Sequence, residues 1–261
     1  CIRTSRNDII GVAGFIIGLQ LERRPRRGAR LRRGQPAQRD ANSMPPHDRR
    51  CVLPGVGSRG RGALALAALV PSSPAVLAHA EKVAQAPFVA AYSDPDAHYQ
   101  ASAELDLSTL EPLVSLPGGV QNAVPISEVA GRTIHHAFIG SCGSSMYEDM
   151  SAAAEVLRGR QVAPGVRLFV VPGSEQTTRR LAADGLLQVL IESGAVVLPP
   201  GCGPCNDAVV GPLHSGEVSI STATNNNHGR FGATDAQLYL GNPETVAASA
   251  VAGHILDPRH L

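Results

Sequence analysis

Short apolar runs alternate with helix-like patterns along the second half of the chain, and this alternation constrains the fold most strongly. Apolar runs of strand length lie at 135–139, 166–171, 195–198 and 218–222. Helical spacing follows the first run, with one apolar face formed by Met146, Met150, Ala153, Ala154 and Leu157. The pattern predicts a three-layer α/β/α domain, with a mostly parallel sheet and helices on both of its faces.

Capping residues predict where two further helices begin. Ser174 is a suitable N-cap for a helix that continues to Ile191, although Gly185 weakens its middle. Asn242 is a suitable N-cap for the last helix, with Pro243 at the first helical position. Each predicted helix follows an apolar strand, as the parallel sheet requires.

The N-terminal part differs in charge and in regularity from the rest of the chain. Residues 1–61 contain 14 Arg and four acidic residues, a net charge of +10, whereas residues 62–261 contain nine basic and 18 acidic residues, a net charge of −9. Residues 1–87 show no sustained periodicity, so we expect an irregular basic and Ala-rich segment before a domain at 88–261. This segment fits a disordered arm, a nucleic-acid-binding tail or, the interpretation we favour, non-native coding sequence from a frameshift or misjoined start.

Composition disfavours two classes of partner. No stretch reaches the roughly 20 apolar residues that a membrane-spanning helix needs. The acidic balance of 62–261 is unsuitable for binding phosphates, and no aromatic residues interleave the N-terminal arginines to stack on bases. We therefore expect neither a membrane nor a nucleic acid as a partner.

Cysteine spacing is the strongest chemical signal. The five cysteines are residues 1, 51, 142, 202 and 205, an odd number that does not suggest a secreted disulfide framework and favours a reducing cytoplasm. Cys202 and Cys205 form a C-x₂-C pair after one predicted strand, and Cys142 follows another. Ligands bind at the carboxyl edge of parallel sheets, where both loops are expected.

Several chemistries remain open for these thiols. Thiolates suit zinc, copper(I) or iron–sulfur clusters, a C-x₂-C pair alone also occurs in redox dithiols, and the spacing can arise without any metal. An electron-transfer cluster normally has four cysteine ligands. Three thiolates on a cubane would leave one iron without a protein ligand, and such an iron can act as a Lewis acid.

The motifs around these cysteines resemble the aconitase and isopropylmalate isomerase family. The resemblance covers about residues 88–258, in order and at natural spacing, and its segments are 94–97, 105–112, 138–142, 147–150, 162–174, 198–205, 219–232 and 246–253. It implies a hydro-lyase large subunit that dehydrates or isomerises a hydroxy di- or tricarboxylic acid, 3-isopropylmalate dehydratase-like. It also implies a separate small subunit that carries a swivelling domain.

The resemblance assigns roles to five residues. Cys142, Cys202 and Cys205 match the three ligands of a [4Fe–4S] cluster. Arg230 matches an arginine that binds a substrate carboxylate, and Asn226 matches a residue that bonds a carboxylate or a cluster sulfide. No catalytic acid or base can be assigned.

Departures from the family pattern put the usual substrates in question. Thr224-Asn225 stands where the family has Asn-Arg, and Gly143-Ser144 stands where it has Thr-Asn. The family's Asp-Ser-His-Thr motif is absent, and we interpret His135 and His136 as packing or surface residues. We therefore expect this chain alone to be incomplete and inactive. The alternatives are a non-catalytic iron–sulfur or metal-binding module, and a nucleic-acid binder that uses residues 1–61.

Overall fold

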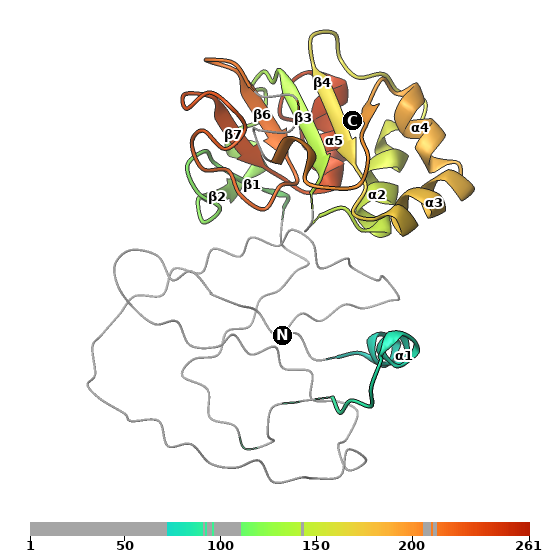
Figure 1. The fold of residues 1–261 in the computed structure, drawn as a ribbon. Helices are drawn as coiled ribbons and strands as arrows, with labels where there is room; N and C mark the ends of the chain where they lie inside the picture. Colours follow the sequence, from blue (N-terminus) through green and yellow to red (C-terminus); the bar gives the residue numbers. More distant parts are fainter. Residues whose placement is uncertain are drawn as a thin grey trace, which may run out of the picture. The chain divides into compact units, whose positions relative to one another are not determined.

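The computed structural model describes residues 72–90, 92, 96, 111–141, 144–205, 210 and 213–261. These residues fall into two compact units, with the described residues before 110 in one and those after it in the other (Figure 1). In the first unit, α1 (Pro74–Val83) begins at the N-cap Ser73, and none of its residues is buried. This helix lies within 1–87, where the sequence predicted irregular structure. No helix among the described residues has both the length and the apolar character needed to span a membrane.

The second unit is built on a seven-stranded sheet in the order β2-β1-β7-β6-β3-β4-β5. Strands β3 to β7 run parallel to one another, and β1 pairs antiparallel with both β2 and β7. The α/β class with a mostly parallel sheet is therefore as predicted. The strands are β1 (Leu113–Ser115), β2 (Ala123–Pro125), β3 (His136–Gly140), β4 (Arg167–Val171), β5 (Val196–Val197), β6 (Val218–Ser221) and β7 (Gln237–Leu240).

Helices follow the parallel strands, with caps that the sequence indicated. The Oδ1 atom of Asn242 accepts a hydrogen bond of 2.8 Å from the backbone N–H of Thr245, and Pro243 occupies the first turn. The α-helices are α2 (Tyr147–Leu157), α3 (Glu175–Ala183), α4 (Leu186–Glu192) and α5 (Pro243–Ala252). Short 3-10 helices are η2 (Ile126–Glu128), η3 (Gly203–Cys205) and η4 (Pro258–His260).

The single helix expected from Ser174 to Ile191 is in fact two helices. Gly185 adopts a left-handed conformation with φ of 73°, which ends the run of α3 and becomes the N-cap of α4. Within α4, Val189 and Leu190 are buried, while Ile191 is 57% exposed. The sequence predicted an apolar face of Leu187, Leu190 and Ile191 for this helix, and that prediction was wrong at Ile191.

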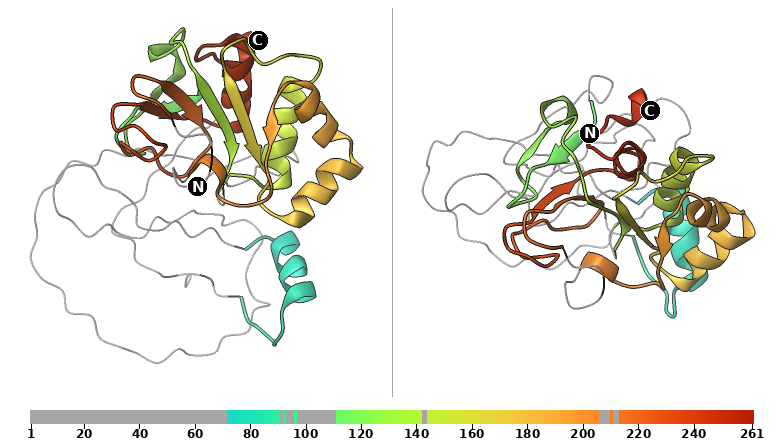
Figure 2. Two further views of the ribbon diagram at one scale, coloured as in Figure 1. Left: turned by 45° about the horizontal axis from the view of Figure 1, so that its top comes forward. Right: turned by 90° about the horizontal axis from the view of Figure 1, so that it is seen from above.

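Successive side chains along the central strands enter two different cores. Ala137 and Ile139 point to the core that α2, α3, α4 and α5 share, the helix-side core, whereas Phe138 points to the opposite face. The second core, the loop-side core, joins sheet residues to loop residues that include Cys205, Leu213 and Phe231. Figure 2 shows α2 to α5 gathered on one side of the sheet. In the part of the chain that the structure describes, loops rather than helices cover the second face, so the helices that the sequence predicted for both faces lie on one.

Candidate functional site

The carboxyl end of β3 is fixed by a threonine from the neighbouring strand. The Oγ1 atom of Thr222, directly after β6, accepts a 2.8 Å hydrogen bond from the N–H of Gly140 and donates to its carbonyl at 3.1 Å. The backbone N–H of Thr222 also donates to the carbonyl of Phe138 at 3.0 Å. The chain therefore leaves β3 along a defined path immediately before Cys142, which itself lies outside the described residues.

A second contact joins this turn to the end of β4. The hydroxyl of Ser145 donates to the carbonyl of Ser141, and the carbonyl of Ser145 accepts a 2.9 Å hydrogen bond from the N–H of Gly173. A Cβ atom on Gly173 would lie 2.7 Å from the hydroxyl oxygen of Ser145, so only glycine permits this approach. The loops after β3 and β4 are thus held against each other.

The C-x₂-C loop lies at the same end of the sheet. It follows β5, and the N–H of Cys205 donates to the carbonyl of Cys202 at 3.1 Å. Gly203 has φ of +51°, and a Cβ atom there would come within 2.5 Å of Cγ2 of Val171, the last residue of β4. Neither thiol forms a disulfide bond; Cys202 is exposed, and Cys205 is buried in the loop-side core.

The guanidinium of Arg230, which lies 25 residues further along the sequence, contacts the thiol of Cys205. Nη2 of Arg230 lies 3.8 Å from Sγ of Cys205, and the Arg230 side chain is otherwise exposed. The neighbouring residue, Phe231, is 1% exposed and anchors this loop in the loop-side core. The structure therefore brings together two residues that the sequence analysis proposed separately for metal binding and for substrate binding.

Asn226 is fully buried, and its amide nitrogen already has two partners. Nδ2 donates to the carbonyl of Leu116 at 2.7 Å and to the carbonyl of Leu238 at 3.0 Å. The Oδ1 atom has no hydrogen-bond partner among the described residues. These contacts tie the loop of Arg230 to the β1–β2 turn and to β7. Asn225 is more accessible, and its Oδ1 accepts a 2.8 Å hydrogen bond from the N–H of Asn227.

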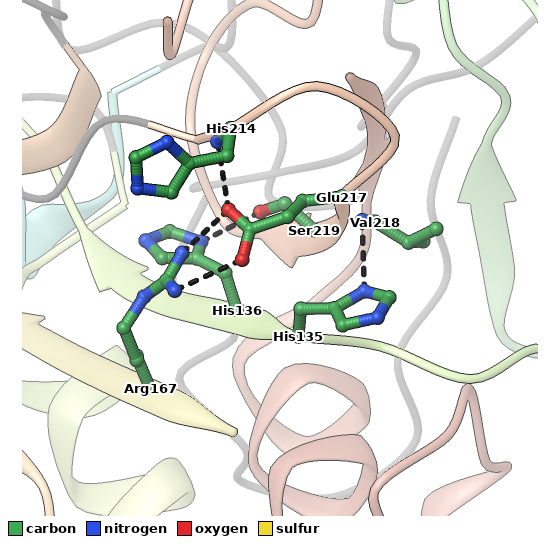
Figure 3. A network of polar contacts seen from close by, with 7 residues as sticks. All are labelled: His135, His136, Arg167, His214, Glu217, Val218 and Ser219. Carbon is green, nitrogen blue, oxygen red and sulfur yellow. Dashed lines mark hydrogen bonds and ion pairs between the residues drawn. The ribbon is translucent and has the colours of Figure 1, made fainter. Parts of the chain in front are cut away.

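A polar network occupies the opposite edge of the sheet, where the parallel strands begin (Figure 3). The guanidinium of Arg167 donates to both carboxylate oxygens of Glu217, at 2.9 and 2.7 Å, and these hydrogen bonds lower the pKa of Glu217 to about 2. Nδ1 of His136 lies 2.8 Å from Oγ of Ser219, and burial lowers the pKa of His136 to about 3. The backbone N–H of Val218 donates to the ring of His135 at 3.1 Å.

The residues of this network lie where strands begin, and His136 is packed between aromatic rings. His136 packs against the rings of Phe169 and Phe231, with centroids 5.5 and 6.2 Å away. His136 and Arg167 are the first residues of their strands, whereas the cysteine loops follow strand ends. Burial of His136 agrees with the packing role expected from the sequence.

Two residues at the site were not singled out from the sequence. Thr222 holds the end of β3, and Ser141 adopts φ of 83°, the only positive φ of a non-glycine residue in the described ranges. Their positions beside Cys142 and after a strand were visible in the sequence. Their bonding was not, because it depends on two strands that lie 82 residues apart.

The fold and this end of the sheet define a class: an α/β domain in which loops bring two cysteine thiols and a guanidinium to the carboxyl ends of parallel strands. Among the described residues, no group of three or more His, Cys, Asp or Glu side chains is placed to hold a metal. Two thiols of the predicted set are described, and the third, Cys142, directly follows the described Ser141 in sequence.

Comparison with known proteins relates one region of the chain to a known family. Residues 127–253 match the model of the aconitase family (aconitate hydratase). The homoaconitase large subunit of Thermus thermophilus is 50% identical over 170 residues, which cover 65% of this chain and 41% of the relative.

Two dehydratase subunits are similarly close. The 3-isopropylmalate dehydratase large subunit of Mycolicibacterium smegmatis is 49% identical, over 66% of this chain and 41% of the relative. The large subunit 1 of the same enzyme from Methanopyrus kandleri is 48% identical, over 64% of this chain and 40% of the relative. The aligned region thus spans about 40% of the length of these relatives.

Proposed function

We propose that this chain is the cluster-binding part of an aconitase-type hydro-lyase large subunit. Its substrate would be a hydroxy di- or tricarboxylic acid, and its reaction a dehydration or isomerisation of the 3-isopropylmalate dehydratase kind. The observation that carries the proposal is the 3.8 Å approach of Nη2 of Arg230 to Sγ of Cys205, which places a carboxylate-binding group beside a metal-binding group. The names of the most similar relatives support the same reaction class.

The proposed cofactor is a [4Fe–4S] cluster held by Cys142, Cys202 and Cys205. The described residues fit such a group: the two thiols of the C-x₂-C loop are unbonded, and Ser141, beside the third, has a buried hydroxyl without a partner among the described residues. Thiolates are the preferred ligands of these clusters. A cluster bound by three thiolates would supply a Lewis-acidic iron for the substrate hydroxyl and one carboxylate.

Arg230 is the proposed carboxylate-binding residue. Its guanidinium is exposed except for the contact with Cys205, and a planar guanidinium binds a carboxylate through two parallel hydrogen bonds. Asn226 is the second proposed substrate-binding residue. Because the side chain is fully buried and its Nδ2 is committed to two backbone carbonyls, Asn226 would have to move before it could donate a hydrogen bond to a carboxylate or a cluster sulfide.

The proposal includes a partner and a compartment. The relatives are named large subunits, so we expect a separate small subunit to complete the active site. The proposed ligands must remain thiols, and Cys202 and Cys205 are unbonded, which favours the reducing cytoplasm.

Anaerobic reconstitution with iron and sulfide tests the cofactor. The wild-type chain should gain the visible absorbance of an iron–sulfur cluster and about four iron atoms per chain. Cys205→Ser should lose both, because two thiolates hold a cubane poorly, whereas Cys51→Ser, outside the matched residues, should retain both. A colourless wild-type chain, or a Cys205→Ser variant with a full complement of iron, would contradict the proposal.

Turnover separates a hydro-lyase from a non-catalytic module. The loaded chain would be mixed with the small subunit and the remaining large-subunit region of a related dehydratase, and dehydration of 3-isopropylmalate and homologous hydroxy acids would be measured. Arg230→Lys should lower kcat/KM by about tenfold or more, since an ammonium cannot bind a carboxylate through a planar pair of hydrogen bonds. A stable cluster without turnover in any such mixture would instead indicate a metal-binding module.

A further inference from the structure

Ser141 combines two unfavourable features at the end of β3. Its φ of 83° lies in the left-handed region, which non-glycine residues adopt uncommonly. Its side chain is fully buried, and its hydroxyl has no hydrogen-bond partner among the described residues. A buried polar group without a partner is costly, and so is a strained backbone. Both together suggest that the hydroxyl has a partner outside the protein's own described groups.

Position limits what that partner can be. Ser141 directly precedes Cys142 and directly follows Gly140, whose Cβ position would lie 2.4 Å from the carbonyl oxygen of Val171. The C-x₂-C loop contacts the same residue, because a Cβ on Gly203 would lie 2.5 Å from Cγ2 of Val171. Ser141 therefore lies at the strand end where the two cysteine-bearing segments converge.

The carbonyl of Ser141 accepts a hydrogen bond from the protein, whereas its hydroxyl has no hydrogen-bond partner among the described residues. The hydroxyl of Ser145 donates to this carbonyl, and the carbonyl of Ser145 is in turn bound by Gly173. The first contact fixes the carbonyl of Ser141, and the second fixes the serine that donates to it. The neighbouring serine is thus committed to the protein, whereas the Ser141 hydroxyl is held in place without a described protein partner.

We propose that the Ser141 hydroxyl donates a hydrogen bond to a sulfur atom of the bound cluster and raises its reduction potential. This inference rests on the proposed function, because it requires the cluster. Donors to cluster sulfur stabilise the more negative, reduced state, so hydrogen bonding is one of the factors that set the potential. The strained backbone serves to hold the donor beside the sulfur, which an extended serine at this turn would not do.

Two substitutions separate the hydroxyl from the strain. Ser141→Ala removes the hydroxyl and keeps a Cβ at positive φ, whereas Ser141→Gly removes the hydroxyl and also relieves the strain. Ser219→Ala is a matched control: Ser219 is equally buried, but its hydroxyl bonds His136 at the opposite edge of the sheet. All variants would be made in the full 261-residue chain and reconstituted anaerobically.

The measurement is a redox titration of the cluster followed by electron paramagnetic resonance. Ser141→Ala and Ser141→Gly should both lower the midpoint potential by the same amount, about tenfold in the reduction equilibrium constant, which is about 59 mV for one electron. Ser219→Ala should leave the potential unchanged. If Ser141→Ala loads cluster poorly, Ser141→Gly carries the test, because its backbone is less strained.

Different outcomes overturn different claims. A wild-type chain that never acquires a cluster would refute the proposed function, and this inference with it. A wild-type cluster whose potential is the same in both Ser141 variants would refute only the hydrogen bond from Ser141. A shift in Ser141→Gly without one in Ser141→Ala would also refute it, because that result assigns the effect to backbone strain.

Discussion

Replacing Thr222 with Val removes the hydroxyl that holds the end of β3 while leaving the volume of the side chain nearly unchanged. Thr222 is 4% exposed, and its Oγ1 is the acceptor for the N–H of Gly140 at 2.8 Å. In Thr222→Val this buried N–H loses its partner, which costs about 1–3 kcal/mol. Since valine matches threonine in shape, a cavity adds little, and we expect a loss of about 2 kcal/mol in the free energy of unfolding.

Such a loss is measurable in this chain by urea unfolding followed by far-ultraviolet circular dichroism, because the sequence contains no Trp for fluorescence. For a unit of about 150 residues, about 2 kcal/mol corresponds to a decrease in Tm of about 4–8 °C. Thr234→Val is the control: Thr234 is exposed, so the same chemical change should alter stability by less than about 0.5 kcal/mol.

Comparing Thr222→Val with Thr234→Val also tests whether the hydroxyl of Thr222 supports the proposed cluster site. Thr222→Val should bind less iron after reconstitution than Thr234→Val, because Gly140 leads directly into the segment of Cys142. Equal denaturation midpoints for the two variants would refute the reasoning, since they would show that the buried hydroxyl contributes no more than an exposed one.

Three further predictions concern other parts of the domain. Burial holds His136 neutral in the folded state, with a pKa near 3 against 6.5 for a free imidazole. Between pH 3 and 6.5 the folded state therefore binds fewer protons than the unfolded state. The contribution of neutral His136 to the free energy of unfolding is complete above pH 6.5 and falls by up to about 1.4 kcal/mol per pH unit below it. His136→Phe should flatten this dependence in urea unfolding at pH 7, 6 and 5, and parallel slopes for wild type and variant would contradict the assignment. Gly203→Ala should abolish iron binding, because its Cβ would lie 2.5 Å from the side chain of Val171 at the end of β4. Gly201→Ala in the same loop is the control: its Cβ would have no atom within 4 Å, and it should bind iron normally. Equal iron contents in the two variants would show that the close contact between Gly203 and Val171 is unimportant for the site. Asn226→Ala should lower the free energy of unfolding by about 2 kcal/mol, because the carbonyls of Leu116 and Leu238 lose the hydrogen bonds from its side chain. Asn227→Ala, at an exposed position, should change the free energy of unfolding little. A thermal melt in which both variants match the wild type would argue that these hydrogen bonds do not hold the loop to the sheet.

Local signals predicted several elements correctly because their cause is local. The period of the apolar residues in 150–157 and the cap at Asn242 act within one or two turns, and both are present in the structure. Met146, which was expected on the same apolar face, is instead the N-cap of α2 and is 60% exposed. Gly185 was recognised as weak but not as a break, because the choice of a left-handed conformation depends on how α3 and α4 each pack on the core. The short β1, β2 and β7 were not predicted, although the equally short β5 and β6 were.

The sequence by itself determined the α/β class and the mostly parallel sheet, because alternating apolar periods are a property of the chain order. Tertiary structure alone decided that loops cover one face of the described sheet, that Arg230 reaches Cys205, and that Ser141 carries a strained backbone and a buried hydroxyl. Each of these depends on residues distant in sequence that meet only after the sheet has formed, and pairwise contacts of that kind leave no periodic pattern in the chain.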